Sequence, residues 1–245
     1  RSTPRENRGT RIYTSTVFPA DQRINLHNEG TYWKRWALKI YFCCLVAAEQ
    51  GGATPIADVR KVYQRIPPDI RDRFIEKQIM YVRNYNDGFG LAWQEVFQTQ
   101  DRSEVEAYCR TNGIEFEWKE GERLRTRQVR PAVRNHPETG EPVWFNHGAF
   151  FHAAALAPSV RETLMEEFGA EGLPYHTLYG DGSPIADESV RTILDCYRAE
   201  QVVFSWQPGD VLMQDNMAIA HAREPYVGDR EVLTAMTDAY SDSDD

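Results

Sequence analysis

The run "LKIYFCCLVAA", from Leu38 to Ala48, has the sequence of a buried β-strand and is followed by the glycine pair Gly51-Gly52. Its aromatic and β-branched side chains favour a strand over a helix, and the glycines predict a turn. Its uninterrupted apolar part, Ile40 to Ala48, is less than half of the roughly 20 residues that a membrane-spanning helix needs. We therefore expect a soluble protein with this run in its core.

Helices are expected in the middle of the chain. The segment that opens with Asp101 has the spacing of a capping box with Glu104, and the segment behind Asp187 repeats apolar residues at helical spacing from Val190 to Tyr197. The expected helices are "DVRKVYQRI", "DIRDRFIEKQIMYV" after Pro67-Pro68, "DRSEVEAYC", "PSVRETLMEEFG" and "DESVRTILDCYRAE".

Strands are predicted again in the second half of the chain. Two hairpins are expected, one of "RLRTRQVRPAV" with "EPVWFN" about the turn "HPETG", the other of "VVFSW" with "VLMQDN" about "QPGD", and "EVLTAM" is a last strand. Strands at both ends of the sequence must pair across the helices to bury their apolar faces, which suits an antiparallel barrel or jelly roll with inserted helices. We expect a single domain, 1–245, with helical inserts at roughly 57–112 and 157–200.

Charge and cysteine content restrict the partners and the compartment. The formal net charge is −9, with 37 acidic and 28 basic residues, so the surface would repel nucleic acid. The four cysteines show no C-x-x-C spacing, and Cys43 and Cys44 lie in an apolar run, which favours reduced thiols and a cytoplasmic protein. No signal peptide is recognisable, and we expect no membrane partner. The sequence begins without a methionine, so we expect upstream residues to be missing.

The stretch "RINLHNEGTYW", from Arg23, places His27 and Glu29 one residue apart directly after an alternating run. On a strand, residues i and i+2 point to the same side, so the imidazole and the carboxylate would share a face. A hydrogen-bonded pair on a solvated sheet would look the same. If the two ends of the chain pair in one barrel, His221 can reach them, and two histidines with one carboxylate form the facial triad of a non-haem Fe(II) site. The other histidines, which are His136, His147, His152 and His176, are expected to be surface or hydrogen-bonding residues.

Several longer pieces of the chain carry a family resemblance. They are "LHNE", "GGATPIADVRKVYQRI", "RLRTRQVRPAVRNHPETGEPVWFN", "YGDGSPI" and "WQPGDVLMQDNMAIAHAREPY". Together with the spacing of His27, Glu29, Thr54, His221 and Arg230, they resemble the taurine dioxygenase (TauD/TfdA) family of Fe(II)/2-oxoglutarate oxygenases. The similarity is to the branch found in peptide-antibiotic gene clusters, that of the syringomycin-cluster aspartyl hydroxylase. It implies a double-stranded β-helix (jelly-roll) barrel, mainly β with inserted helices, of which an N-terminal part lies outside this sequence.

The resemblance also implies roles for individual residues. His27, Glu29 and His221 match the family's iron ligands, Thr54 matches the hydroxyl that binds the far carboxylate of 2-oxoglutarate, and Arg230 matches the guanidinium that clamps it. The interval from His221 to Arg230 is shorter than is usual in the family, so Arg223 is the alternative clamp, unless it is a strand-end residue paired with Glu224 or a backbone carbonyl.

Fe(II), 2-oxoglutarate and O₂ are therefore the expected cofactor and cosubstrates. A carboxylate at Glu29 occupies the position that chloride takes in related halogenases, which favours hydroxylation. The resemblance implies an amino-acid-type substrate, free or presented on a carrier protein, and Arg127 and Asn146 are candidate substrate contacts. The alternatives are that Arg123, Arg125 and Arg127 form a solvated face paired with acids and that Asn146 serves a turn. At the level of function, the alternatives are a desaturase or epoxidase of the same family and a non-catalytic jelly-roll regulatory module.

Overall fold

The computed structural model describes residues 7–9, 12–15, 18–85 and 90–241. Its contacts divide the chain into two compact units. The insert unit consists of the described parts of Ile66–Ala132 and of His147–Asp195. The barrel unit consists of the described parts of Thr3–Arg65, Val133–Asn146 and Cys196–Asp245. In the described part of the chain, no helix is both long and apolar enough to cross a membrane.

The larger sheet of the barrel unit is built around the strand predicted from the apolar run. That strand, β4, pairs with strands from the far end of the chain on both of its edges, and every pairing in the sheet is antiparallel. Its inward side chains Ile40, Phe42 and Cys44 pack with Trp206 and Val232 in one apolar cluster. In sheet order the strands are β1 (Asn7–Gly9), β2 (Ile12–Thr14), β17 (Glu231–Tyr240), β4 (Trp36–Val46) and β14 (Val211–Asp215).

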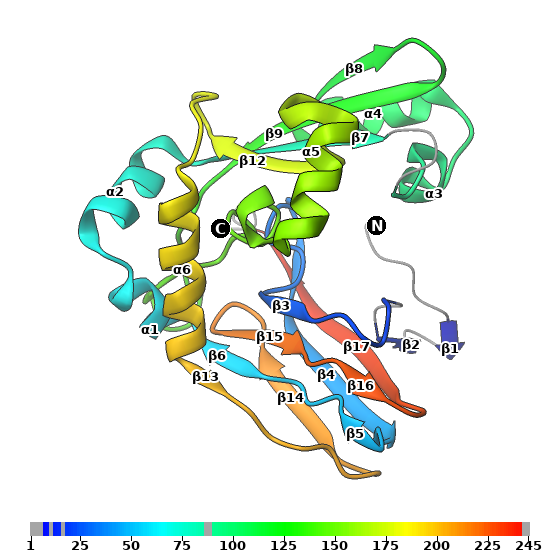
Figure 1. Ribbon diagram of the computed structural model, residues 1–245, viewed down its shortest axis with the longest axis vertical. Helices are drawn as coiled ribbons and strands as arrows, with labels where there is room; N and C mark the ends of the chain where they lie inside the picture. Colours follow the sequence, from blue (N-terminus) through cyan, green and yellow to red (C-terminus); the bar gives the residue numbers. More distant parts are fainter. Residues whose placement is uncertain (1–6, 10–11, 16–17, 86–89, 242–245) are drawn as a thin grey trace. The chain divides into compact units, whose positions relative to one another are not determined.

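The smaller sheet of the barrel unit joins the two ends of the sequence again, because β15 lies between β6 and β3 (Figure 1). The mainly β, jelly-roll class is confirmed, with strands from both chain ends side by side in two sheets. In sheet order the strands are β13 (Gln201–Val202), β6 (Ile56–Asp58), β15 (Ile219–Arg223) and β3 (Ile24–His27); the unit also holds the pairs β5 (Gln50–Gly51) with β16 (Tyr226–Val227) and β10 (Arg134–Asn135) with β11 (Pro142–Val143), and helix α1 (Val59–Arg65).

Both predicted hairpins need correction. β13 and β14 belong to different sheets, since β13 pairs with β6 and β14 with β4, and Phe204 and Trp206 between them pack into the apolar cluster instead of a ladder. The turn "HPETG" does connect a hairpin, but its strands are the short pair β10 and β11. The predicted strand at Arg123 exists as β9, with partners in the insert unit.

The insert unit contains a four-stranded antiparallel sheet and most of the helices. The segment "DIRDRFIEKQIMYV" is wrongly predicted as one helix, because the helix ends at Lys77 and Gln78 has a positive φ of 62°, which lies outside the α-helical range. The β-branched and aromatic residues beyond it form a central strand, as their propensity favours. In sheet order the strands are β12 (Tyr175–Tyr179), β7 (Ile79–Tyr85), β9 (Arg123–Arg130) and β8 (Glu115–Lys119); the helices are α2 (Pro68–Lys77), α3 (Trp93–Phe97), α4 (Arg102–Asn112), η1 (Ala153–Ala155), α5 (Pro158–Gly172) and α6 (Asp187–Ala199), which runs past the end of the unit.

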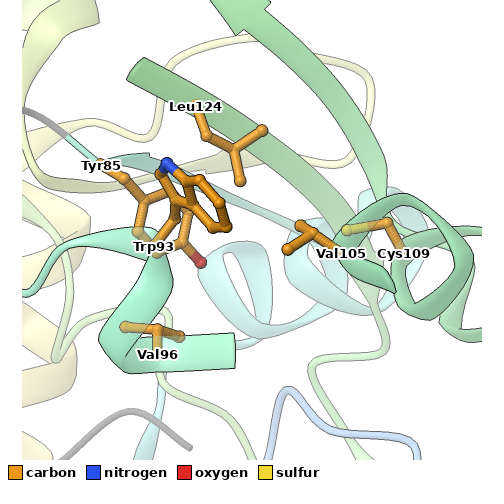
Figure 2. Packing of buried hydrophobic residues seen from close by; sticks show 6 residues of the cluster. All are labelled: Tyr85, Trp93, Val96, Val105, Cys109 and Leu124. Carbon is orange, nitrogen blue, oxygen red and sulfur yellow. The ribbon is translucent and has the colours of Figure 1, made fainter. Parts of the chain in front are cut away.

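Helix α4 shows how local sequence and packing combine in this unit. Asp101 caps it as predicted, its carboxylate accepting a hydrogen bond from the Ser103 amide at 2.7 Å. One face of the helix buries Val105 and Cys109 completely, and burial of such side chains contributes roughly 1.5 to 3 kcal/mol each. The cluster around them is drawn in Figure 2 and consists of Tyr85, Trp93, Val96, Val105, Cys109 and Leu124.

Candidate metal centre and anion pocket

Three potential metal ligands converge in the barrel unit. His27 ends β3, His221 lies in β15, and the two residues are direct partners in the antiparallel pairing of these strands. Their ring centroids are 4.6 Å apart. One ligand atom each from His27, Glu29 and His221 lies within 4.8 Å of the others. The structure thus brings together the three residues that the sequence suggested, and they form the one such group among the described His, Cys, Asp and Glu side chains.

Glu29 reaches this position in a way that differs from the prediction. The strand stops at His27, so Glu29 stands in the following turn and not on a shared strand face. Its backbone is held by the side chain of Asn216, which accepts from the Glu29 N–H at 2.8 Å and donates to the Glu29 carbonyl at 2.9 Å. These polar groups are therefore not available to a strand ladder, which explains why β3 ends where it does.

The two imidazoles are oriented by hydrogen bonds at Nδ1. Nδ1 of His27 lies 2.8 Å from the carbonyl of Asn25 and must donate to it, which leaves a lone pair on Nε2. Nδ1 of His221 lies 2.9 Å from the side-chain amide of Gln214, a buried residue of β14. Metal-bound histidines characteristically donate a hydrogen bond from the second ring nitrogen, as His27 does. The Gln214 atom beside His221 is the amide nitrogen, so His221 can bind a metal through Nε2 when the amide turns to present Oε1, a buried atom without a hydrogen-bond partner, to Nδ1. Two imidazoles and one carboxylate, with both Nδ1 atoms occupied, fit an Fe(II) ion with open coordination positions.

A pocket that is partly open to solvent adjoins two of the three ligands, His27 and His221. Its wall combines two imidazoles, three hydroxyls and two guanidinium groups with apolar side chains. The residues that line it are Ser15, Ile24, His27, Phe42, Thr54, His221, Ala222, Arg223, Arg230, Val232 and Thr234. A small ligand with a carboxylate would meet both cationic groups and metal-ligand candidates in this cavity.

Arg230 is positioned to receive such a carboxylate. Its Nε donates to the carbonyl of Gly52 at 2.9 Å, and Nη2 lies 3.4 Å from the hydroxyl of Thr54. Burial, and then the nearby charge of Arg223, lower the pKa of Arg230 to about 10. Among the described residues, no carboxylate pairs with Arg230. A desolvated cation without a counter-ion favours binding of an anion.

Thr54 and Gly52 both contact the side chain of Arg230. The indole N–H of Trp206 donates to the Thr54 hydroxyl oxygen at 2.8 Å, so the oxygen accepts from Trp206 and its own proton can point to a ligand. Gly52 has a positive φ of 69°, and a Cβ there would lie 3.1 Å from Cδ of Arg230. The glycine therefore lets the arginine lie directly across the backbone.

Arg223 lies beside Arg230 but is occupied differently. Its Nη1 donates to the carbonyl of Phe18 at 2.9 Å, and its Nη2 donates to the carbonyls of Pro19 and Gln22. Burial lowers its pKa. Its terminal nitrogens therefore hold the segment that leads into β3. This matches the alternative role for Arg223, that of a strand-end residue bound to backbone carbonyls. This arrangement favours Arg230 over Arg223 as the carboxylate clamp.

The two candidate substrate contacts lie in different units. Arg127 belongs to β9 of the insert unit, where its guanidinium lies 3.7 Å from the carboxylate of Glu117. Its neighbour on the same face, Arg125, is bound to Asn84 and to the Glu171 carbonyl. Asn146 is buried in the barrel unit and does not line the cavity.

The remaining histidines are hydrogen-bonding or packed residues rather than surface ones. Nε2 of His136 lies 2.9 Å from the carboxylate of Asp215, and His136, His147 and His152 are each only 4% exposed. Of the two alternatives expected for these residues, hydrogen bonding instead of a surface position holds for His136 and His152, whose Nδ1 accepts from the Ala154 amide.

Three supporting residues were missed by reading the sequence, namely Gln214, Asn216 and Trp206. One signal was present, since β14 buries its polar residue Gln214 and exposes Val211 and Met213 by 66% and 60%. A strand with its polar side chain inside needs a buried partner for that side chain. The partner here is a metal-ligand candidate, His221.

Comparison with known proteins finds a matching family model and similar proteins. The model of the family described as "Taurine catabolism dioxygenase TauD, TfdA family" matches residues 1–237. The dapdiamide synthesis protein DdaC of Enterobacter agglomerans is 42% identical over 238 residues, which are 97% of this chain and 72% of that protein. A clavaminate synthase-like protein of Arabidopsis thaliana is 29% identical over 245 residues, or 95% of this chain and 70% of its own length.

The fold has counterparts among solved structures. The structure of asparagine oxygenase in complex with Fe(II), 2S,3S-3-hydroxyasparagine and succinate superposes with a TM-score of 0.55 at 13% identity, over 94% of this chain and 57% of the other. The likeness therefore extends to the arrangement of strands and helices. With a family model that matches nearly its whole length, this chain belongs to the TauD, TfdA family of dioxygenases.

Proposed function

We propose that this dioxygenase uses Fe(II), 2-oxoglutarate and O₂ to hydroxylate an unactivated C–H bond of an amino acid, free or carried on a carrier protein, in the synthesis of a peptide natural product. The observation that carries the proposal is the convergence of His27, Glu29 and His221 beside a cavity that contains Thr54 and Arg230. Membership of the family and the 42% identity to a protein of dapdiamide synthesis support it.

The chain's own residues have separable tasks in this reaction. His27, Glu29 and His221 would hold the iron, while Arg230 and Thr54 would bind the far carboxylate of 2-oxoglutarate and so aim its keto acid end at the metal. Phe42 and Val232 also line the cavity and would help to exclude water from the bound cosubstrate. Bound iron with 2-oxoglutarate and O₂ supplies the oxidising power needed to break a C–H bond.

Glu29 supports hydroxylation in particular. A carboxylate that binds the metal leaves no room for a halide at that position, so transfer of oxygen to the substrate is the expected outcome. The acidic net charge of −9 supports a small-molecule substrate and argues against nucleic acid as a partner.

The test begins without oxygen. Anaerobic addition of Fe(II) and 2-oxoglutarate should produce the visible charge-transfer band of a metal-chelated keto acid, and the band should be absent in His221→Ala. A wild-type protein without this band would argue for a non-catalytic module.

The reaction type is then read from the products. The protein is incubated with Fe(II), 2-oxoglutarate, O₂ and a panel of free and carrier-bound amino acids, and both succinate and product mass are followed. A gain of one oxygen atom supports hydroxylation. A loss of two hydrogens would replace the proposal with a desaturase, and oxygen added to an olefin would replace it with an epoxidase.

A further inference from the structure

We propose that Asn216 is a positioning residue for the metal ligand Glu29. The inference rests on the proposed function, because it assumes that Glu29 binds the metal. Asn216 is completely buried, and its side-chain amide is bound to both polar groups of the Glu29 backbone. It would therefore determine where the Glu29 carboxylate points, without touching the metal or the cosubstrate itself.

The side chain of Asn216 makes three hydrogen bonds. Oδ1 accepts from the Glu29 N–H at 2.8 Å, while Nδ2 donates to the carbonyls of Glu29 and Ala37 at 2.9 and 2.8 Å. An amide has both a donor and an acceptor in one plane, so it can hold the N–H and the carbonyl of a single residue at once. This double contact restricts the rotation of the backbone on both sides of the Glu29 Cα atom.

The main chain of Asn216 binds the same loop at both ends. Its carbonyl accepts from Nδ2 of Asn28 at 2.7 Å, and its N–H donates to the carbonyl of Leu38 at 2.7 Å. Asn216 thus joins the residues just after β3 to the first residues of β4 and closes the base of the loop that carries Glu29. A loop closed in this way loses much of its conformational freedom before a metal binds.

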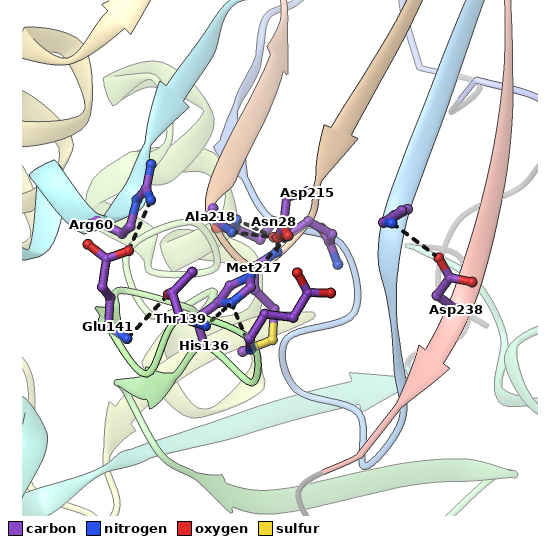
Figure 3. A network of polar contacts seen from close by, with 12 residues as sticks. Asn28, Arg60, His136, Thr139, Glu141, Asp215, Met217, Ala218 and Asp238 are labelled. Atoms are coloured by element: carbon purple, nitrogen blue, oxygen red, sulfur yellow. Dashed lines mark hydrogen bonds and ion pairs between the residues drawn. The ribbon is translucent and has the colours of Figure 1, made fainter.

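The turn that presents Asn216 is itself held from another part of the barrel unit. Oδ1 of Asp215 accepts from the amides of Met217 and Ala218 at 2.8 and 3.0 Å, and Oδ2 lies 2.9 Å from Nε2 of His136 (Figure 3). Nδ1 of His136 accepts from the amides of Glu138 and Thr139, so Nε2 carries the proton. The turn is therefore fixed by contacts that do not involve the metal ligands.

The consequence for metal binding follows from these contacts. Replacing Asn216 by alanine leaves the Glu29 N–H and carbonyl without their partner, and the carboxylate must be ordered when the metal binds. Removal of a residue that orients a ligand typically weakens metal affinity 10- to 100-fold. A merely structural role would lower the stability of the fold and leave the affinity of the folded protein unchanged.

The experiment measures Co(II) binding by visible absorption and the melting temperature of the metal-free protein by circular dichroism. The variants are Asn216→Ala and Asn84→Ala. Asn84 is a matched control in the insert unit, buried, with Nδ2 donating to the carbonyls of Glu171 and Leu173 and Oδ1 accepting from Arg125. Each variant loses three hydrogen bonds of a buried asparagine.

We expect a lower melting temperature for both variants. Only Asn216→Ala should bind Co(II) about 10- to 100-fold more weakly than wild type. If Asn216→Ala does not fold, Asn216→Asp keeps the size and the acceptor, removes both donors, and should weaken Co(II) in the same direction. Wild-type affinity in a folded Asn216 variant would overturn the positioning role alone. A wild-type chain that binds no Co(II) would overturn the proposed function as well.

Discussion

His27 and His221, from the two ends of the chain, face each other directly across the antiparallel pair of β3 and β15. Their ring centroids lie 4.6 Å apart. Directly opposed residues on neighbouring strands keep their side chains close, so this pairing brings both imidazoles to one point. The candidate metal centre therefore exists only while the two ends of the barrel unit are paired, and metal binding and folding must be linked.

The first prediction follows from this linkage. Co(II) at 100 times its dissociation constant should stabilise the folded protein by about 2.7 kcal/mol and raise its melting temperature. His221→Ala should lose the metal-dependent shift. The check is thermal unfolding with and without Co(II), and an equal shift in the variant would show that the ion binds elsewhere.

The second prediction separates the two arginines. Arg230→Ala should raise the concentration of 2-oxoglutarate that is required at least tenfold, because a charge-assisted pair is lost, while Co(II) affinity stays close to wild type. Arg223→Ala should mainly lower the melting temperature, since its guanidinium binds backbone carbonyls of Phe18, Pro19 and Gln22. Titration of the charge-transfer band measures the first effect. A larger loss of 2-oxoglutarate binding in Arg223→Ala would make Arg223 the clamp.

The third prediction concerns the type of reaction. Glu29→Ala should abolish hydroxylation, and Glu29→Asp should keep part of it because an oxygen ligand remains. The wild-type enzyme should give unchlorinated product even at high chloride concentration. Product mass decides both points, and either a chlorinated product from wild type or full activity in Glu29→Ala would contradict this role of Glu29.

The fourth prediction is a pH dependence in the insert unit. Burial, and then the neighbouring His176, lower the pKa of His152 to about 4, against the opposing charge of Asp187; Arg161 lies nearby and acts in the same direction as burial. The folded state therefore binds fewer protons than the unfolded state below pH 6.5. Neutral His152 contributes fully to the free energy of unfolding above pH 6.5. This contribution is lost as the pH falls towards 4, and about 2 kcal/mol of it is gone at pH 5.

The test for His152 uses a variant that keeps its local role. Nδ1 of His152 caps η1 by accepting from the amide of Ala154 at 3.1 Å, and asparagine can accept the same bond. His152→Asn should lose less stability than wild type between pH 7 and pH 5 in urea unfolding. If His152→Asn lost as much unfolding free energy as wild type between pH 7 and pH 5, the acid sensitivity would come from other groups.

Local sequence predicted the parts of this fold that depend on residues near one another. The strand around Ile40 and Phe42, the cap at Asp101 and a helix that begins directly at the Pro67-Pro68 pair follow from propensity and spacing over a few positions. The helix predicted across Gln78 was wrong because the structure there depends on distant residues. The residues after Gln78 form a strand that pairs with β9 and β12, which lie far away in the sequence.

The sequence by itself determined which side chains are available as ligands, namely His27, Glu29, His221, Thr54 and the two arginines, because donor chemistry belongs to the residue type. Only the tertiary structure decided how these groups are used. It ended β3 at His27, placed Gln214 behind His221, tied Arg223 to backbone carbonyls and left Arg230 without a described carboxylate partner. The physical reason is that each buried donor must find an acceptor, and in this barrel those acceptors come from strands and loops that are distant in the sequence.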